Sequence, residues 1–162
     1  EGVLNNIDEV LQQVNDFNVV LLCIGGNDLL NGIDDPQSPI DNINLIISAI
    51  QTVQPDVTIF IEKIAPGNAE LMTPEFQLKI SEFNQLITNI ATSQTNANSI
   101  VTAVDMNTGF TEDLLADDVH YNQEGALFIA EKYFNAISSV FNSNSTLTIL
   151  PLGDSRVEGA RP

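Results

Sequence analysis

The sequence predicts a three-layer α/β/α sandwich built around a parallel sheet. Two kinds of segment alternate along the chain. Residues 19–24 are a continuous apolar run, which is typical of a strand buried on both faces of a sheet, and residues 57–64 are the next predicted strand. Amphipathic segments of helical period lie between the strands, at the length that a crossover between parallel strands needs. In folds of this class, binding sites gather outside the carboxyl ends of the strands.

The first half of the chain supplies two helices and one strand. Residues 3–14 carry an apolar stripe at helical spacing, formed by Val3, Leu4, Ile7, Leu11 and Val14. The run 19–24 is the first strand. Ser38 as a cap and Pro39 in the first turn predict the start of the next helix, and Pro55 marks its end. The apolar stripe of that helix is Ile40, Ile43, Ile47, Ile50 and Val53.

The second half continues the alternation. Residues 57–64 form the second strand. Thr73 and Pro74 predict the start of a third helix, whose buried face is formed by Phe76, Ile80, Phe83, Ile87 and Ile90. Residues 100–104 are a short strand. Asn122 predicts the cap of the last helix.

The composition limits the possible partners. The 162 residues are enough for a single domain with its own core, and they carry 22 acidic and five basic side chains, a net charge of −17. Nucleic acid is excluded, because its binding needs clustered Lys and Arg. No membrane partner is expected, because no apolar run approaches the roughly 20 residues of a membrane span. No signal peptide is visible, but the acidity favours a secreted or extracellular setting.

Three polar motifs follow predicted strands or lie in loops. A polar linker, residues 142–146, leads to a final strand at 147–152, which runs into Gly153-Asp154-Ser155. Gly25-Gly26-Asn27-Asp28 follows the first strand, and Asp117-Asp118-Val119-His120 precedes the last helix. Each motif alone is ordinary turn material, and a lone histidine is usually a surface residue. Their combination predicts chemistry.

The four motif residues have roles that complete one another. Serine is a poor nucleophile until a base removes its proton, so Ser155 needs His120. A carboxylate must fix the imidazole tautomer, and Asp117 reaches the same ring if the loop makes one turn. The amide of Asn27 can donate to a developing oxyanion. No cofactor or metal is expected, since the one histidine and Cys23 lie far apart in sequence and form no ligand cluster.

These stretches resemble the signature blocks of the SGNH hydrolases, also called GDSL esterases/lipases, whose fold is flavodoxin-like. Leu150 to Ser155 and Val104-Asp105-Met106 are similar to the carbohydrate-esterase branch related to acetylxylan esterases. The resemblance implies a catalytic triad of Ser155, His120 and Asp117. It implies an oxyanion hole formed by Asn27 and the backbone N–H of Ser155. Gly26, Asp28 and Asp154 are the supporting positions of these blocks, and Asp118 is a rival for Asp117 that the family spacing disfavours.

The order of the blocks differs from the family. The serine block comes first in the family and last here, so we expect a circular permutation. The linker 142–146 is long enough to join the last helix to the serine strand. An alternative is a tandem array, in which residues 147–162 begin the next copy. Ser155 then serves a different active site from His120.

A segment of the family pattern also has no counterpart here. The family places several tens of residues between the serine block and the helix equivalent to residues 3–14, including a strand and an oxyanion glycine. Gly2 corresponds to a later position. We therefore expect residues 1–162 to form a single domain that lacks this segment, with a second chain or segment completing it. We expect the chain alone to be marginally stable and weakly active.

The resemblance implies a serine esterase that hydrolyses small acyl esters, such as O-acetyl groups on carbohydrate, through an acyl-enzyme intermediate. Two rivals remain open. One is a catalytically silent module of the same fold that binds carbohydrate or another protein within a larger secreted protein. The other is a generic flavodoxin-like domain whose motifs are accidental turns, and it predicts that Ser155 and His120 lie far apart.

Overall fold

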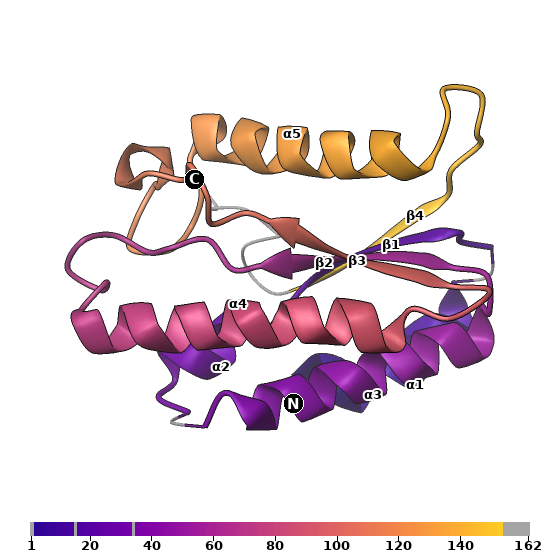
Figure 1. Ribbon diagram of the computed structural model, residues 1–162, viewed down its shortest axis with the longest axis horizontal. Helices are drawn as coiled ribbons and strands as arrows, with labels where there is room; N and C mark the ends of the chain where they lie inside the picture. Colours follow the sequence, from indigo (N-terminus) through magenta and orange to yellow (C-terminus); the bar gives the residue numbers. More distant parts are fainter. Residues whose placement is uncertain (1, 15, 34, 154–162) are drawn as a thin grey trace.

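A four-stranded parallel sheet forms the middle layer of the computed structural model, which describes residues 2–14, 16–33 and 35–153. The elements in chain order are α1 (Gly2–Gln13), β1 (Val19–Cys23), α2 (Gly26–Leu30), α3 (Gln37–Val53), β2 (Thr58–Lys63), α4 (Pro74–Gln94), β3 (Ile100–Asp105), the 3-10 helix η1 (Glu112–Leu114), α5 (Gln123–Val140) and β4 (Ile149–Gly153). Helix α5 covers one face of the sheet, and α1, α3 and α4 cover the other (Figure 1). This confirms the predicted three-layer α/β/α fold.

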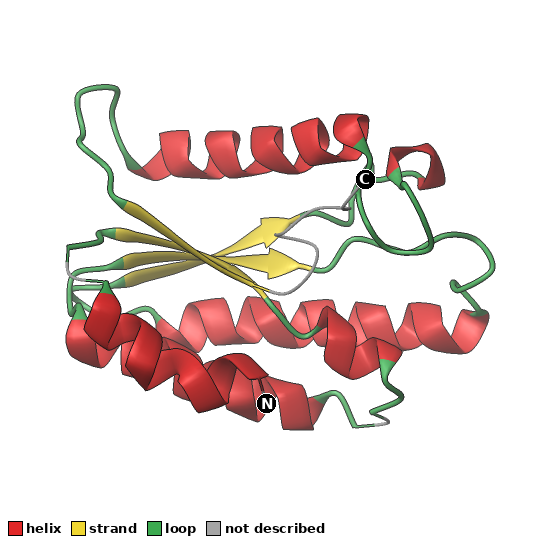
Figure 2. Ribbon diagram, turned by 180° about the vertical axis from the view of Figure 1, so that it is seen from behind, coloured by secondary structure: helices red, strands yellow, loops and turns green. Residues whose placement is uncertain are grey.

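The strand order is β3-β2-β1-β4, and every neighbouring pair is parallel. The last strand of the chain therefore lies beside the first, in a register that pairs Val19 with Ile149 and Cys23 with Gly153. Figure 2 shows the strands of the sheet twisting together between the two helical layers. Because all strands run the same way, the segments that leave their carboxyl ends meet at one edge of the sheet.

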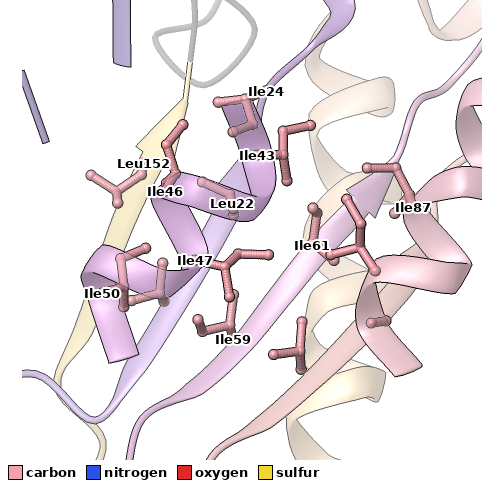
Figure 3. Close-up of a cluster of buried hydrophobic side chains, with 14 of the residues drawn as sticks. Leu22, Ile24, Ile43, Ile46, Ile47, Ile50, Ile59, Ile61, Ile87 and Leu152 are labelled. Atoms are coloured by element: carbon pink, nitrogen blue, oxygen red, sulfur yellow. The ribbon is translucent and has the colours of Figure 1, made fainter. Parts of the chain in front are cut away.

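The larger core lies between the sheet and α3. Helix α3 presents Ile43, Ile47 and Ile50 of its predicted stripe to the strands, together with Ile46, which was not predicted (Figure 3). The prediction for Val53 is wrong, because this last residue of α3 is 52% exposed. The same cluster receives Leu22, Ile59, Ile61, Ile87 and Leu152. Strand side chains alternate between the two faces, so Leu150 and Leu152 of β4 join this core, while Ile149 and Pro151 are exposed.

The second core lies under α5 and contains a buried polar pair. Phe60, Met106 and Ile129 pack together in it. The Tyr133 hydroxyl donates a 2.6 Å hydrogen bond to the carboxylate of Glu62, which is buried in β2. Burial, and next to it the Glu62 charge, raise the pKa of Tyr133 well above its usual value. This bond satisfies a buried carboxylate and ties α5 to the sheet.

Two of the three predicted helix caps are confirmed. The side chain of Thr73 accepts from the N–H of Phe76 at 3.2 Å, and that of Asn122 accepts from the N–H of Gly125 at 2.9 Å. The prediction for Ser38 is wrong, because α3 begins at Gln37, two residues before Pro39, and its N-cap residue is Pro36. Asp35 accepts from the N–H of Gln37 at 3.0 Å instead.

The short helix α2 was not predicted. It lies inside the Gly-Gly-Asn-Asp motif, where the sequence indicates only a turn. Five residues are too few to show a helical period. Within the described residues, no helix is long and apolar enough to cross a membrane.

Replacing Ile47 by alanine tests the α3 core. The side chain is 0% exposed, so Ile47→Ala should lower the free energy of unfolding by about 3 kcal/mol. Leu45, on the same helix, is 57% exposed, and Leu45→Ala should change it by less than about 0.5 kcal/mol. Urea unfolding measures both. Equal effects of the two substitutions would contradict this placement of α3.

Candidate active site

The loop before α5 brings together the predicted base and its carboxylate. His120 Nδ1 lies 2.8 Å from Oδ2 and 3.1 Å from Oδ1 of Asp117. Asp117 Oδ1 also accepts from the backbone N–H groups of Val119, at 3.0 Å, and His120, at 2.8 Å. The carboxylate therefore closes a tight turn over its own loop, which is how a residue three positions away reaches the ring.

The same hydrogen bonds set the charge of this pair. The N–H groups of Val119 and His120 stabilise the carboxylate and lower the pKa of Asp117 to about 2, with a smaller contribution from the imidazole of His120. The carboxylate is thus ionised at neutral pH and can only accept. A neutral imidazole beside it carries its proton on Nδ1, so Nε2 is the basic nitrogen.

Asn122 and Gly125 fix the path of this loop. The amide of Asn122 donates to the carbonyl oxygens of Asp113, at 2.7 Å, and Leu115, at 3.2 Å. The N–H of Ala116 donates to the carbonyl oxygen of His120 at 2.7 Å. A Cβ atom on Gly125 would clash with the backbone of Leu114, so the start of α5 packs directly on the loop.

A second loop holds Asp118, the rival carboxylate, away from this pairing. The Asn68 side chain donates to Asp118 Oδ1 at 2.6 Å, and the Asn68 N–H donates to the Asp118 carbonyl oxygen at 2.9 Å. Asn68 Oδ1 accepts from the N–H of Leu71 at 2.9 Å. Sequence reasoning does not single out Asn68 as a functional residue. Its only sequence signal is a Pro-Gly-Asn turn soon after the buried strand β2.

The Gly-Gly-Asn-Asp motif turns sharply after β1. Gly25 has φ +97°, and a Cβ atom there would clash with the ring of Phe83. Gly26 is buried and begins α2, which leaves Asn27 exposed and Asp28 half-buried. No hydrogen bond to the Asn27 side chain is formed within the described residues.

Asn27 and the end of β4 line one cavity. Its volume is about 690 Å³, and Gly25, Asn27, Asp28 and Gly153 are among its lining residues. Gly153 is the last residue of β4 and pairs with Cys23 of β1. Asp154 and Ser155 lie outside the described residues.

The structure thus pairs His120 with Asp117, and places Asn27 at the cavity where β4 ends. Within residues 2–14, 16–33 and 35–153, no group of three His, Cys, Asp or Glu side chains could hold a metal ion. The arrangement supplies an oriented imidazole and an exposed side-chain amide.

Known proteins resemble this chain in sequence and in fold. A sequence model of the GDSL-like lipase/acylhydrolase family matches residues 2–127. A carbohydrate esterase of family 3 from Talaromyces cellulolyticus superposes with a TM-score of 0.75 at 27% identity, over 88% of this chain and 68% of that one. A second family 3 carbohydrate esterase, from Clostridium thermocellum, gives 0.67 at 29% identity, over 86% and 64%.

An acetyl esterase, solved as a serine-to-alanine mutant with an acetate ion, is also similar. Its TM-score is 0.71 at 28% identity, over 86% of this chain and 68% of that one. No curated protein sequence matches the chain significantly.

The turn at Gly25 should tolerate no side chain. In Gly25→Ala, both the left-handed backbone and the clash with Phe83 destabilise the fold, and we expect a loss of at least about 3 kcal/mol in the free energy of unfolding. Gly32 has φ +80°, and a Cβ atom there would meet nothing within 4 Å, so Gly32→Ala should cost only about 1 kcal/mol. Urea unfolding measures the free energy of unfolding of both variants. Similar losses in Gly25→Ala and Gly32→Ala would contradict the role of Phe83.

The charge of Asp117 should depend on its backbone hydrogen bonds. Its pKa is depressed, so it stabilises the fold above the unfolded value of about 4, and this contribution is lost as the pH falls through about 2. A carboxyl NMR titration should give a midpoint near 2. His120→Ala removes the smaller contribution only, so its midpoint should stay well below 4. A return to about 4 in that variant would show that the imidazole is the main cause.

Proposed function

This chain belongs to the GDSL-like lipase/acylhydrolase family and is an ester hydrolase of the SGNH type, and we propose that it removes small acyl groups, such as O-acetyl groups, from carbohydrate. The observation that carries the catalytic part is the 2.8 Å contact between His120 Nδ1 and an ionised Asp117. The substrate class is supported by structural relatives that are carbohydrate esterases and an acetyl esterase, at 27–29% identity.

In the proposed reaction, Ser155 Oγ attacks the ester carbonyl while His120 Nε2 takes its proton. The ionised Asp117 keeps the ring in the productive tautomer and stabilises the imidazolium. The tetrahedral oxyanion accepts hydrogen bonds from the Asn27 side chain and the Ser155 N–H. One such donor contributes about 3 kcal/mol in the transition state. Gly26, Asp28 and Asp154 have supporting roles beside these donors in this proposal.

The rest of the reaction has two steps, formation of an acyl-enzyme and its hydrolysis. His120 returns the proton to the leaving alcohol oxygen, and the acyl group stays on Ser155 Oγ. Water attacks this acyl-enzyme with His120 again as the base, which releases the carboxylic acid and restores the serine. The proposed chemistry uses no cofactor.

We propose that Ser155 serves the His120 of its own chain, in a single permuted domain. The support is the pairing of β4 with β1, which brings Gly153, two residues before Ser155, beside Cys23. Completion of the domain by a further segment or a second chain is also a proposal. Its support is the exposed side of β4, where Ile149 is 42% exposed. A secreted or extracellular location is proposed from the net charge of −17 and the carbohydrate substrate.

Hydrolysis of p-nitrophenyl acetate tests the assigned roles. Ser155→Ala and His120→Ala should lower kcat at least about 1,000-fold, since one removes the proposed nucleophile and the other the proposed base. Asn27→Ala should lower it about 100-fold with little change in KM, since the oxyanion exists only in the transition state.

The matched control is Asp118→Asn. An amide oxygen there still accepts from Asn68, so we expect less than a fivefold change, whereas Asp117→Asn should lower kcat at least 100-fold. A serine-directed phosphonate should label Ser155 in the parent. A parent protein that is neither labelled nor active would refute the esterase function. The rival interpretation, a catalytically silent binding module, would then remain.

A further inference from the structure

A second cavity, of about 600 Å³, opens where β2 and β3 end. It shares no lining residue with the cavity at Asn27. Lys63 and Asp105, the last residues of these strands, line it together with Pro66 and Gly67 of the loop that follows β2. Ligands of open α/β sheets bind outside the carboxyl ends of the strands, which is the position of this cavity.

A row of uncharged polar side chains on α4 lines one side of the cavity. Gln77, Ser81, Gln85 and Thr88 recur at helical spacing, and all of them line it. The Ser81 hydroxyl forms no hydrogen bond within the described part of the chain. The Gln85 amide contacts only Asn89 there, at 3.4 Å. These two groups can exchange hydrogen bonds with the hydroxyl groups of a ligand.

The one basic side chain that lines the cavity in the described part of the chain is paired with a carboxylate, and the remaining charged lining residue, Glu112, accepts from the N–H of Ala69 at 3.2 Å. Lys63 Nζ lies 3.4 Å from Asp105 Oδ2. Burial alone would raise the pKa of Asp105, but hydrogen bonds from Thr108 and Asn107, together with Lys63, lower it to about 2. Among the described residues, Lys63 is the only basic one that lines the cavity. Because Lys63 is paired with Asp105, the described lining offers no unpaired cation to an anionic ligand. Met72 and Ile80 add apolar surface, which suits the C–H faces of a sugar ring.

Hydrogen bonds connect the lining of this cavity to the loop that carries Asp117 and His120. Gly67 and Ala69, which line it, flank Asn68, and Asn68 holds Asp118 by two hydrogen bonds. Asp118 in turn follows Asp117 directly. We propose that this cavity binds the uncharged carbohydrate part of the ester substrate. This inference rests on the proposed function, whose alcohol component it names.

Filling the cavity should weaken carbohydrate binding at least tenfold and leave ester hydrolysis intact. In Ser81→Trp the new side chain occupies the cavity. The control is Glu82→Trp, since Glu82 is exposed on the same helix and does not line the cavity. Unacetylated xylotetraose and cellotetraose are titrated against the full chain, and amide NMR shifts give Kd. We expect Kd to rise at least tenfold in Ser81→Trp for the oligosaccharide that the parent binds, and to stay unchanged in Glu82→Trp.

Hydrolysis of p-nitrophenyl acetate should stay within about twofold of the parent in both variants, because this ester has no carbohydrate part. Failure of the parent to bind either oligosaccharide, or an unchanged Kd in Ser81→Trp, would overturn the inference. If Ser81→Trp does not fold, Gln85→Ala replaces it, with an expected threefold rise in Kd, and an unchanged value overturns the inference. An inactive parent that still binds oligosaccharide would refute the proposed function alone.

Discussion

Parallel pairing of all four strands is the constraint on which both candidate sites depend. Since each strand enters the sheet from the same side, the segments after β1, β2, β3 and β4 leave at one edge. The chain places its polar motifs in those segments. Replacing any one strand by an antiparallel one would send its motif to the opposite edge, so the site residues need no direct attraction to gather there.

Hydrogen bonds then fix the positions of the side chains at this edge of the sheet. Asp117 accepts from two backbone N–H groups and from the imidazole, so its loop sets both the position and the charge of the carboxylate. Asn122 and Asn68 tie that loop to α5 and to the segment after β2. A base held in this way loses little conformational freedom when a substrate binds, which is how preorganised sites favour the transition state.

The sequence predicts those features that depend on local pattern. The strands follow from apolar runs, and the caps at Thr73 and Asn122 follow from residue type and position. The Asp117 contact with His120 is equally local, because it closes a turn of four residues. Asn68 is different, since it bonds to a residue 50 positions away, and only the tertiary structure brings the two together. The start of α3 was mispredicted because Ser38 is a good capping residue by type, but it lies inside the helix, whose N-cap is Pro36.

In our proposal, the Gly-Asp-Ser block and the Asp-x-x-His block of one chain form a single active site. The most direct test is the distance between Ser155 Oγ and His120 Nε2 within one chain, in a crystal structure of the whole protein. We expect about 3 Å, the reach of a hydrogen bond between nucleophile and base. A separation above about 10 Å exceeds the looseness of unliganded sites, and it would show that Ser155 serves another copy.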